Sequence, residues 1–241
     1  MLNKNKIAIF LAARSGSKRL PNKHFLKINS DLRVIDLCIL RLKKTKLVNK
    51  IFLCTTREKR DNKFNNICKK HNIKLFRGST NNVAKRIIDC AIKNSIITII
   101  RITADCPLID PKIIDECIKL HYKRKKNYTS NTLKLTFPDG LDVEILSLKT
   151  LIKSQSILKS KYNKEHVTFF IKVSKLFKKN NFKNNINYSN RRWTLDNLDD
   201  FIFLKKVIKY FWPKIYFSWK DLINAEKKNK SLINIKDRLH E

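Results

Sequence analysis

Glycine is nearly absent from this sequence. The chain of 241 residues contains three, Gly16, Gly78 and Gly140, and each stands in a short polar cluster that follows an apolar segment. Glycine lets a backbone turn sharply or approach a ligand closely. Any one of them could mark an ordinary turn, but the shared position of all three favours ligand-binding loops.

Long apolar runs and paired cysteines are also missing. No segment reaches the roughly 20 apolar residues that cross a bilayer, and the opening residues carry no cleavage-site pattern. The six cysteines form no CxxC pair and match no histidine spacing, which indicates buried thiols in a reducing compartment rather than a metal cluster. We therefore expect a cytoplasmic protein without a membrane partner, and its 42% hydrophobic content is enough for one α/β domain.

Acidic residues are few: 20 Asp and Glu stand against 54 Lys and Arg, a formal net charge of +34. Such a charge is typical of proteins that bind nucleic acids or anionic membranes. The lysines are spread along the whole chain, however, as a uniform compositional drift would produce. The densest runs, at 123–127 and 227–231, fall where helices are expected to end. We expect no specific nucleic-acid partner, and a polyanion-binding protein without catalysis is the least favoured alternative.

Strand-like and helical segments alternate over the first half of the chain. Strands are predicted at 6–13, 50–56, 73–78 and 96–103. Each is followed by a helix: at 32–46, through Lys70, at 82–94 and from about 112 to 125. This alternation predicts an α/β fold with a doubly wound, mainly parallel sheet. Ligands of such sheets bind beyond the carboxyl ends of the strands, where the glycine loops would meet.

The alternation of strands and helices ends after Tyr128. Short strand-like pieces over 128–147 indicate a small antiparallel arm on a single domain that spans 1–241. The elements expected after the arm are helices at 148–159, at 165–176 and from Asp199, a strand at 191–196, and a loop at 178–190.

The first polar loop, at 11–23, is strongly basic. Small side chains, Ala12 and Ala13, end the preceding strand and let a ligand approach the backbone. The loop then supplies four cations for oxyanions, Arg14, Lys18, Arg19 and Lys23. It matches neither of the glycine-rich patterns GxxxxGK[ST] and GxGxxG. We interpret it as a phosphate-binding loop rather than a solvated turn because the neighbouring loops also have the features of ligand-binding loops.

Two aspartates are candidate metal ligands. Asp105 follows the strand at 96–103, and Asp110, next to Pro111, is the better cap for the helix after it, which leaves Asp105 available. A carboxylate among phosphates is costly unless a cation bridges them, and Mg²⁺ takes one or two carboxylates together with phosphate oxygens and water. Asp196 is the candidate for the second carboxylate, with helix capping as its alternative role.

Two further segments carry candidate substrate ligands. In FPDGLDVE, Asp139, Asp142 and Glu144 lie close together, and the last two are two residues apart and so share one face of a strand. They could bind the hydroxyls of a sugar-like substrate or form a polar hairpin rim. In EHVT, Glu165 could cap a helix and His166 could bind substrate, although an isolated histidine is more often structural.

Six segments, in order, resemble the cytidylyltransferases that activate acidic sugars, the CMP-Kdo and CMP-sialic acid synthetases. The subgroup most similar is that of spore coat polysaccharide biosynthesis protein F. The segments are AARSGSKRLPNK, FRGST with VAKR, RITADCPLID, FPDGLDVE, EHVT and RWTLDNLDDF, between residue 6 and about residue 205. A chance match of six ordered motifs is improbable.

The resemblance implies a GT-A-like nucleotidyltransferase fold, CTP as the donor, a Mg²⁺ requirement, commonly a homodimer, and a role in polysaccharide biosynthesis. It gives Arg14, Lys23 and Asp105 catalytic roles, and Asp105 and Asp196 the metal. The positions that match the family's nucleotide site are Ala12, Ala13, Arg14, Ser15, Gly16, Arg19, Lys23, Arg77, Gly78, Ser79, Arg86 and Thr103. Those that match its acceptor region are Asp139, Glu144 and His166.

The implied reaction is attack of a sugar oxygen on the α-phosphate of CTP, with pyrophosphate as the leaving group. Mg²⁺, Arg14 and Lys23 would hold the charge that develops on it. No strong general base is visible, as in transfers in which alignment and metal electrostatics dominate. A nucleotidyltransferase of other nucleotide or acceptor specificity is the alternative.

Overall fold

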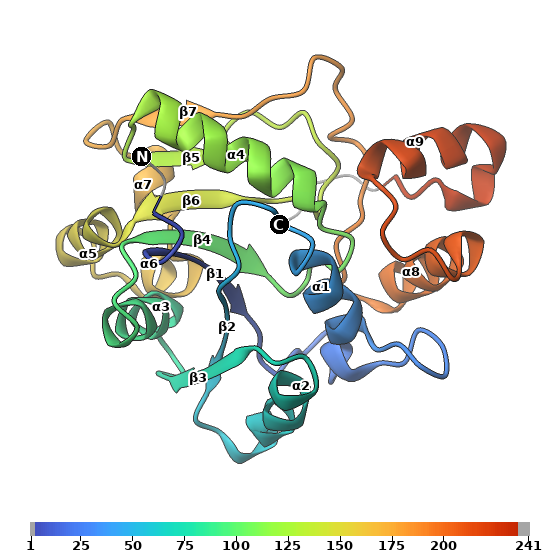
Figure 1. Ribbon diagram of the computed structural model, residues 1–241, viewed down its shortest axis with the longest axis horizontal. Coiled ribbons are helices and arrows are strands. Elements are labelled where there is room, and N and C mark those ends of the chain that lie inside the picture. The colour runs from blue at the N-terminus through green and yellow to red at the C-terminus, as the bar shows by residue number, and fades with distance from the viewer. Residues whose placement is uncertain (1–2, 236–241) are drawn as a thin grey trace.

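The structure is a computed structural model that describes residues 3–235. In this part of the chain seven strands form one sheet, in the order β3-β2-β1-β4-β6-β5-β7 (Figure 1). The strands are β1 Ile7–Ala12, β2 Ile51–Thr56, β3 Lys74–Gly78, β4 Thr98–Thr103, β5 Tyr128–Ser130, β6 Glu144–Ser147 and β7 Lys179–Asn181.

The sheet is mixed and mostly parallel, as the sequence predicts. Strands β1, β2, β3 and β4 run parallel to one another, β6 runs antiparallel to β4 and β5, and β7 is parallel to β5. The central strands are nearly continuous apolar runs because both of their faces are covered. In β1, Ile9 and Leu11 belong to one buried cluster and Ala8 and Phe10 to another, which is the alternation of a strand between two layers.

Helices cover both faces of the sheet. One buried cluster includes side chains from α1, α4, α8 and α9, and the other includes side chains from α3, α5 and α7. The helices are α1 Val34–Leu42, α2 Phe64–Lys70, α3 Val83–Lys93, α4 Pro111–Arg124, α5 Leu148–Ile157, α6 Lys161–His166, α7 Phe169–Val173, α8 Leu198–Phe211 and α9 Trp219–Lys228. The short 3₁₀ helices are η1 Lys23–Phe25, η2 Lys59–Lys63 and η3 Lys230–Leu232.

The helix caps decide which aspartates are available for other roles. Asp110 caps α4 by accepting a hydrogen bond from the Lys112 N–H at 2.8 Å, as predicted. Asn197, not Asp196, caps α8, and Asp200 completes that capping box. Both Asp105 and Asp196 are therefore left out of helix capping.

Three predicted elements differ from the structure. Segment 191–196 forms isolated bridges instead of a strand. The predicted loop at 178–190 contains β7, whose Lys-Asn-Asn sequence has little strand propensity and pairs with β5 through tertiary context. The predicted helix at 165–176 is two short helices, because buried Val167 has a φ of 53° and breaks the chain direction between them.

Gly140 lies in the turn before β6, where the backbone packs closely against the segment that precedes α8. Its φ is +98°, and a Cβ atom there would lie 2.6 Å from the Trp193 carbonyl carbon and 2.7 Å from the Thr194 nitrogen. Both neighbours are backbone atoms. We expect Gly140→Ala to lower the free energy of unfolding by about 3 kcal/mol, measured by urea denaturation.

Gly16→Ala is the matched control. A Cβ there would meet the end of the flexible Arg60 side chain at 2.9 Å, which can move aside, so we expect a loss of less than about 1 kcal/mol. Equal losses at the two glycines would show that the backbone around Gly140 yields, contrary to this account.

Candidate active site

The carboxyl ends of the parallel strands β1 to β4 lie at one edge of the sheet, and β6 begins at the same edge. A cavity of about 310 Å³ opens there. Its lining includes six of the predicted site residues: Thr103, Asp105, Asp139, Glu144, His166 and Asp196. Segments that are far apart in the sequence therefore meet at the edge where ligands of such sheets bind.

Lys23 joins the two candidate metal ligands. Its Nζ lies 2.8 Å from Asp105 Oδ1 and 3.0 Å from Asp196 Oδ1. The same ammonium donates a hydrogen bond to the Leu195 carbonyl at 2.9 Å, and the Leu195 N–H donates to the Asp105 carbonyl at 2.8 Å. The end of the opening loop, the end of β4 and the segment before α8 are thus held together at one cation.

Asp196 lies in a strongly cationic environment. Arg19 is 3.3 Å and Arg192 is 3.1 Å from its carboxylate, in addition to Lys23. Burial alone would raise the pKa of Asp196, but the attraction of Lys23, Arg19 and Arg192 outweighs it and lowers the pKa below its usual value. The carboxylate is therefore ionised at neutral pH.

Arg192 and His24 are site residues that the sequence reasoning missed. The buried guanidinium of Arg192 pairs with Asp139, Asp196 and Asp200, so one cation sets the positions of three carboxylates. Its i,i+4 spacing from Asp196 was the available signal. His24 Nε2 lies 3.7 Å from Asp105, and burial lowers the pKa of His24 to about 4, so it is neutral at pH 7.

A further missed residue, Asp61, orders the opening loop. It accepts a hydrogen bond from the Ser15 N–H at 2.8 Å and from the hydroxyls of Thr55 and Thr56 at the end of β2. Burial favours a higher pKa for Asp61, but the hydrogen bonds from Thr56 and Ser15 lower it. An ionised carboxylate thus ties the basic loop to the neighbouring strand.

Arg14 points elsewhere than expected. Its guanidinium pairs with Glu165 at 3.3 Å, with the Arg14 side chain 53% exposed. Within residues 3–235 no ion pair joins Arg14 to Asp105 or Asp196. An exposed pair of this kind contributes about 0–1 kcal/mol, so little free energy opposes a turn of Arg14 toward a phosphate.

Two other predicted arginines shape loops. Arg77 donates to the Thr56 and Glu58 carbonyls at 3.0 and 2.8 Å. Arg86 is only 1% exposed, and its guanidinium donates to the Ser79 carbonyl at 2.9 and 2.7 Å. A Cβ on Gly78 would meet Arg86 Cγ at 2.8 Å. We therefore assign Arg86 to holding the loop after β3, in place of the direct nucleotide contact that the resemblance implies.

Glu144 is committed to contacts within the protein. It is 3% exposed, pairs with Arg101 and with Lys172 at 2.9 Å, and accepts hydrogen bonds from the hydroxyls of Tyr128 at 2.6 Å and Thr168 at 2.7 Å. Burial alone would raise the pKa of Glu144, but Arg101 and Lys172 hold it well below its usual range. The side chain that was expected to bind the acceptor is therefore the anchor of the cavity wall.

This edge has a basic loop that follows the first strand and two aspartate side chains that pair with one lysine, on a mostly parallel α/β sheet. These features define a nucleotidyltransferase. More specifically, the chain belongs to the cytidylyltransferase family: the family model described as Cytidylyltransferase matches residues 8–210. Membership implies that the protein is an enzyme and that CTP is its nucleotide.

Three relatives match most of the chain. A cytidylyltransferase structure from Leptospira borgpetersenii serovar Hardjo-bovis has a TM-score of 0.91 and 36% identity, and covers 98% of this chain and 99% of that chain. The uncharacterized protein MJ1063 of Methanocaldococcus jannaschii is 31% identical over 98% of this chain and 96% of its own length. Spore coat polysaccharide biosynthesis protein SpsF of Bacillus subtilis is 31% identical over 70% of each.

A more distant structure shares the fold. CMP:2-keto-3-deoxy-manno-octonic acid synthetase, complexed with CTP, has a TM-score of 0.64 and 12% identity, over 85% of this chain and 99% of that chain. The predicted fold and family are confirmed. Among the helices of the described residues, none has the length and apolar character needed to cross a membrane.

Proposed function

We propose that this protein transfers CMP from CTP to an acidic or related sugar for surface polysaccharide biosynthesis, with release of pyrophosphate. The convergence of Asp105 and Asp196 on Lys23, beside the basic loop, carries the proposal. On the resemblance alone we add that the enzyme is a cytoplasmic homodimer and that residues 1–241 form one domain.

The two aspartates suit a magnesium ion. Asp105 Oδ1 and Asp196 Oδ1 both lie within 3.0 Å of one ammonium nitrogen, so they share one cation position. Two carboxylates that leave the other positions to phosphate oxygens and water are the set that Mg²⁺ favours. When bound, the ion would neutralise charge on the triphosphate and on the leaving pyrophosphate.

The chain's own cations would bind the rest of the triphosphate. Lys23 and Arg19 already lie at Asp196, and Arg14 is free of the core and able to turn toward the phosphates. Asp61 fixes the main chain of the loop at Ser15. Pre-placed donors of this kind stabilise charge without reorganising during the reaction.

The acceptor sugar would occupy the 310 Å³ cavity beside these groups. Asp139 and Asp142 on its wall offer acceptors for sugar hydroxyls, and His166 lies on the same wall. Because Glu144 is held by four protein groups, we assign it to positioning this wall. Alignment of the sugar oxygen with the α-phosphate is then the main contribution of the cavity.

A comparison of CTP with UTP, ATP and GTP tests the proposal. A nucleotide at about 100 times its Kd stabilises the folded state by about 2.7 kcal/mol, which is about 5–10 °C in Tm for a chain of this size. With Mg²⁺, we expect that shift from CTP and markedly smaller shifts from the others, measured by thermal denaturation. Pyrophosphate release with a candidate sugar should follow the same order.

Two other outcomes would contradict it. A larger shift with another nucleotide would favour the alternative specificity. The absence of any nucleotide-dependent shift, together with RNA binding that weakens steeply with salt, would favour a polyanion-binding protein.

A further inference from the structure

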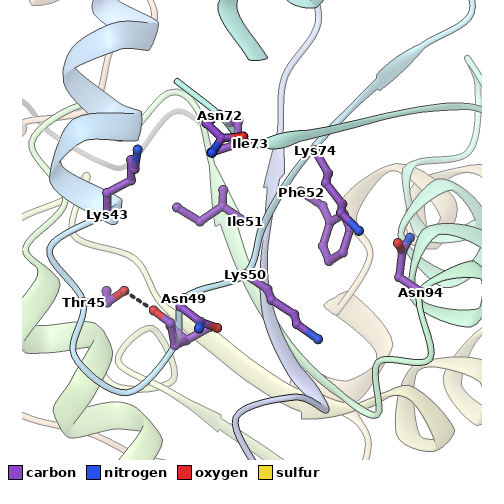
Figure 2. Close-up of a pocket in the computed structure, with 11 residues that line it drawn as sticks. Lys43, Thr45, Asn49, Lys50, Ile51, Phe52, Asn72, Ile73, Lys74 and Asn94 are labelled. Atoms are coloured by element: carbon purple, nitrogen blue, oxygen red, sulfur yellow. Dashed lines mark hydrogen bonds between the residues drawn. The ribbon is translucent and has the colours of Figure 1, made fainter. Parts of the chain in front are cut away.

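A second cavity opens at the opposite edge of the sheet, where β2 and β3 begin. Its volume is about 370 Å³, within the range of small-molecule sites. The floor is apolar, with Ile51 and Phe52 of β2 and Ile73 before β3. Figure 2 shows Ile51 and Phe52 near the centre, Ile73 above them beside Asn72, and polar side chains around them.

The polar lining of this cavity is entirely cationic or neutral. It includes Lys43, Lys50 and Lys74, and among the described residues that line it there is no aspartate or glutamate. In Figure 2, Lys74 and Asn94 lie to the right of the Phe52 ring and Lys50 lies below it. Three ammonium groups without a lining carboxylate repel one another and attract an anion.

Two of the ammonium groups are held in place. Lys50 Nζ donates a hydrogen bond to the Asn5 carbonyl at 2.9 Å, and Lys43 Nζ donates to the His71 carbonyl at 3.0 Å. An ammonium has three N–H groups, so each keeps donors for a ligand. The tethers lower the entropy that these side chains would lose on binding.

The cavity is distinct from the candidate active site. Strands β2 and β3 run from it to the edge that carries Thr56 and Gly78. Strands of five or six residues, at about 3.3 Å per residue, separate the two sites by about 15–20 Å. One small ligand cannot reach both.

We propose that this cavity binds a phosphorylated small molecule that also carries a ring or other apolar part. The lysines would bind the phosphate by charge-assisted hydrogen bonds, and the asparagines would bind polar groups of the remainder. The floor of Ile51, Phe52 and Ile73 would cover the apolar part. A nucleotide and a sugar phosphate share this chemistry, and the site does not depend on the proposed function.

Isothermal titration calorimetry at constant ionic strength tests the site, with inorganic phosphate, AMP and glucose 6-phosphate as probes. We expect AMP or glucose 6-phosphate to bind at least about tenfold more tightly than inorganic phosphate, because only they cover the floor. Replacing Lys50 and Lys74 together, by Lys50→Gln and Lys74→Gln, should weaken that binding by about tenfold or more. The probe that binds identifies the source of the ligand.

Two control variants separate the site from general attraction by the net charge. Lys205→Gln with Lys209→Gln removes the same charge from the exposed face of α8, and Lys23→Gln alters the candidate active site. Both should leave binding of the tighter probe unchanged. The single variant Lys74→Glu, at an exposed position, repeats the test if the double variant is unstable. Equal weakening in the controls, or no advantage of either organic phosphate over inorganic phosphate, would overturn the proposal.

Discussion

Asp105→Asn is expected to lower CTP-dependent pyrophosphate release by about 10³-fold or more and to leave the fold intact. The substitution keeps the shape of the side chain and removes one of the two charges that face Lys23. The backbone carbonyl of Asp105 accepts from the Leu195 N–H and the Thr194 hydroxyl, and these contacts are unchanged in the variant. Stability and activity should therefore separate, as measured by thermal denaturation and a pyrophosphate assay.

Asp89→Asn is a matched control for this experiment. The side chain of Asp89 is 37% exposed, the same fraction as that of Asp105, and it pairs with Lys85 on the surface of α3. We expect its pyrophosphate release to equal that of the unmodified protein. Turnover by Asp105→Asn at a rate near that of Asp89→Asn would remove Asp105 from the reaction centre.

The central fold follows directly from local patterns in the sequence. The apolar run that forms β4 predicts a strand that is buried on both faces. Asp110, followed by Pro111, marks the start of α4 because its side chain caps a backbone N–H only two residues away. The weaker elements depended on distant contacts. Strand β7 has no apolar pattern of its own and forms because β5 offers it a partner.

The candidate site was predictable in its charges but not in its pairings. The glycine loops and strand ends identified Asp105 and Asp196, yet 173 residues separate Lys23 from Asp196, and no local pattern encodes that contact. Burial is the reason for the largest differences between the predicted roles of site residues and the roles that the structure indicates. Arg86 and Glu144 carry the charges of ligand-binding residues, but the structure surrounds them with protein donors and acceptors.

The same burial makes Glu144 a large contributor to stability. Glu144→Gln would leave the charges of Arg101 and Lys172 without their shared carboxylate, and breaking a buried pair in this way costs about 3–5 kcal/mol. We expect a loss of that size in urea denaturation, with an unchanged dependence on urea concentration. Glu116→Gln, which breaks an exposed pair with Lys119, should change stability by less than about 1 kcal/mol.

The pH dependence of stability distinguishes a lost charge from a packing defect. Arg101 and Lys172 lower the pKa of Glu144 in the folded state, against the effect of burial, so the unfolded chain takes up the proton at a higher pH than the folded one. The contribution of Glu144 is complete above its ordinary pKa of 4.5 and is lost as the pH falls below that value. The difference in unfolding free energy between the unmodified protein and Glu144→Gln should therefore narrow below pH 4.5. A difference that stays constant from pH 7 to pH 3 would mean that shape, and not charge, makes Glu144 necessary.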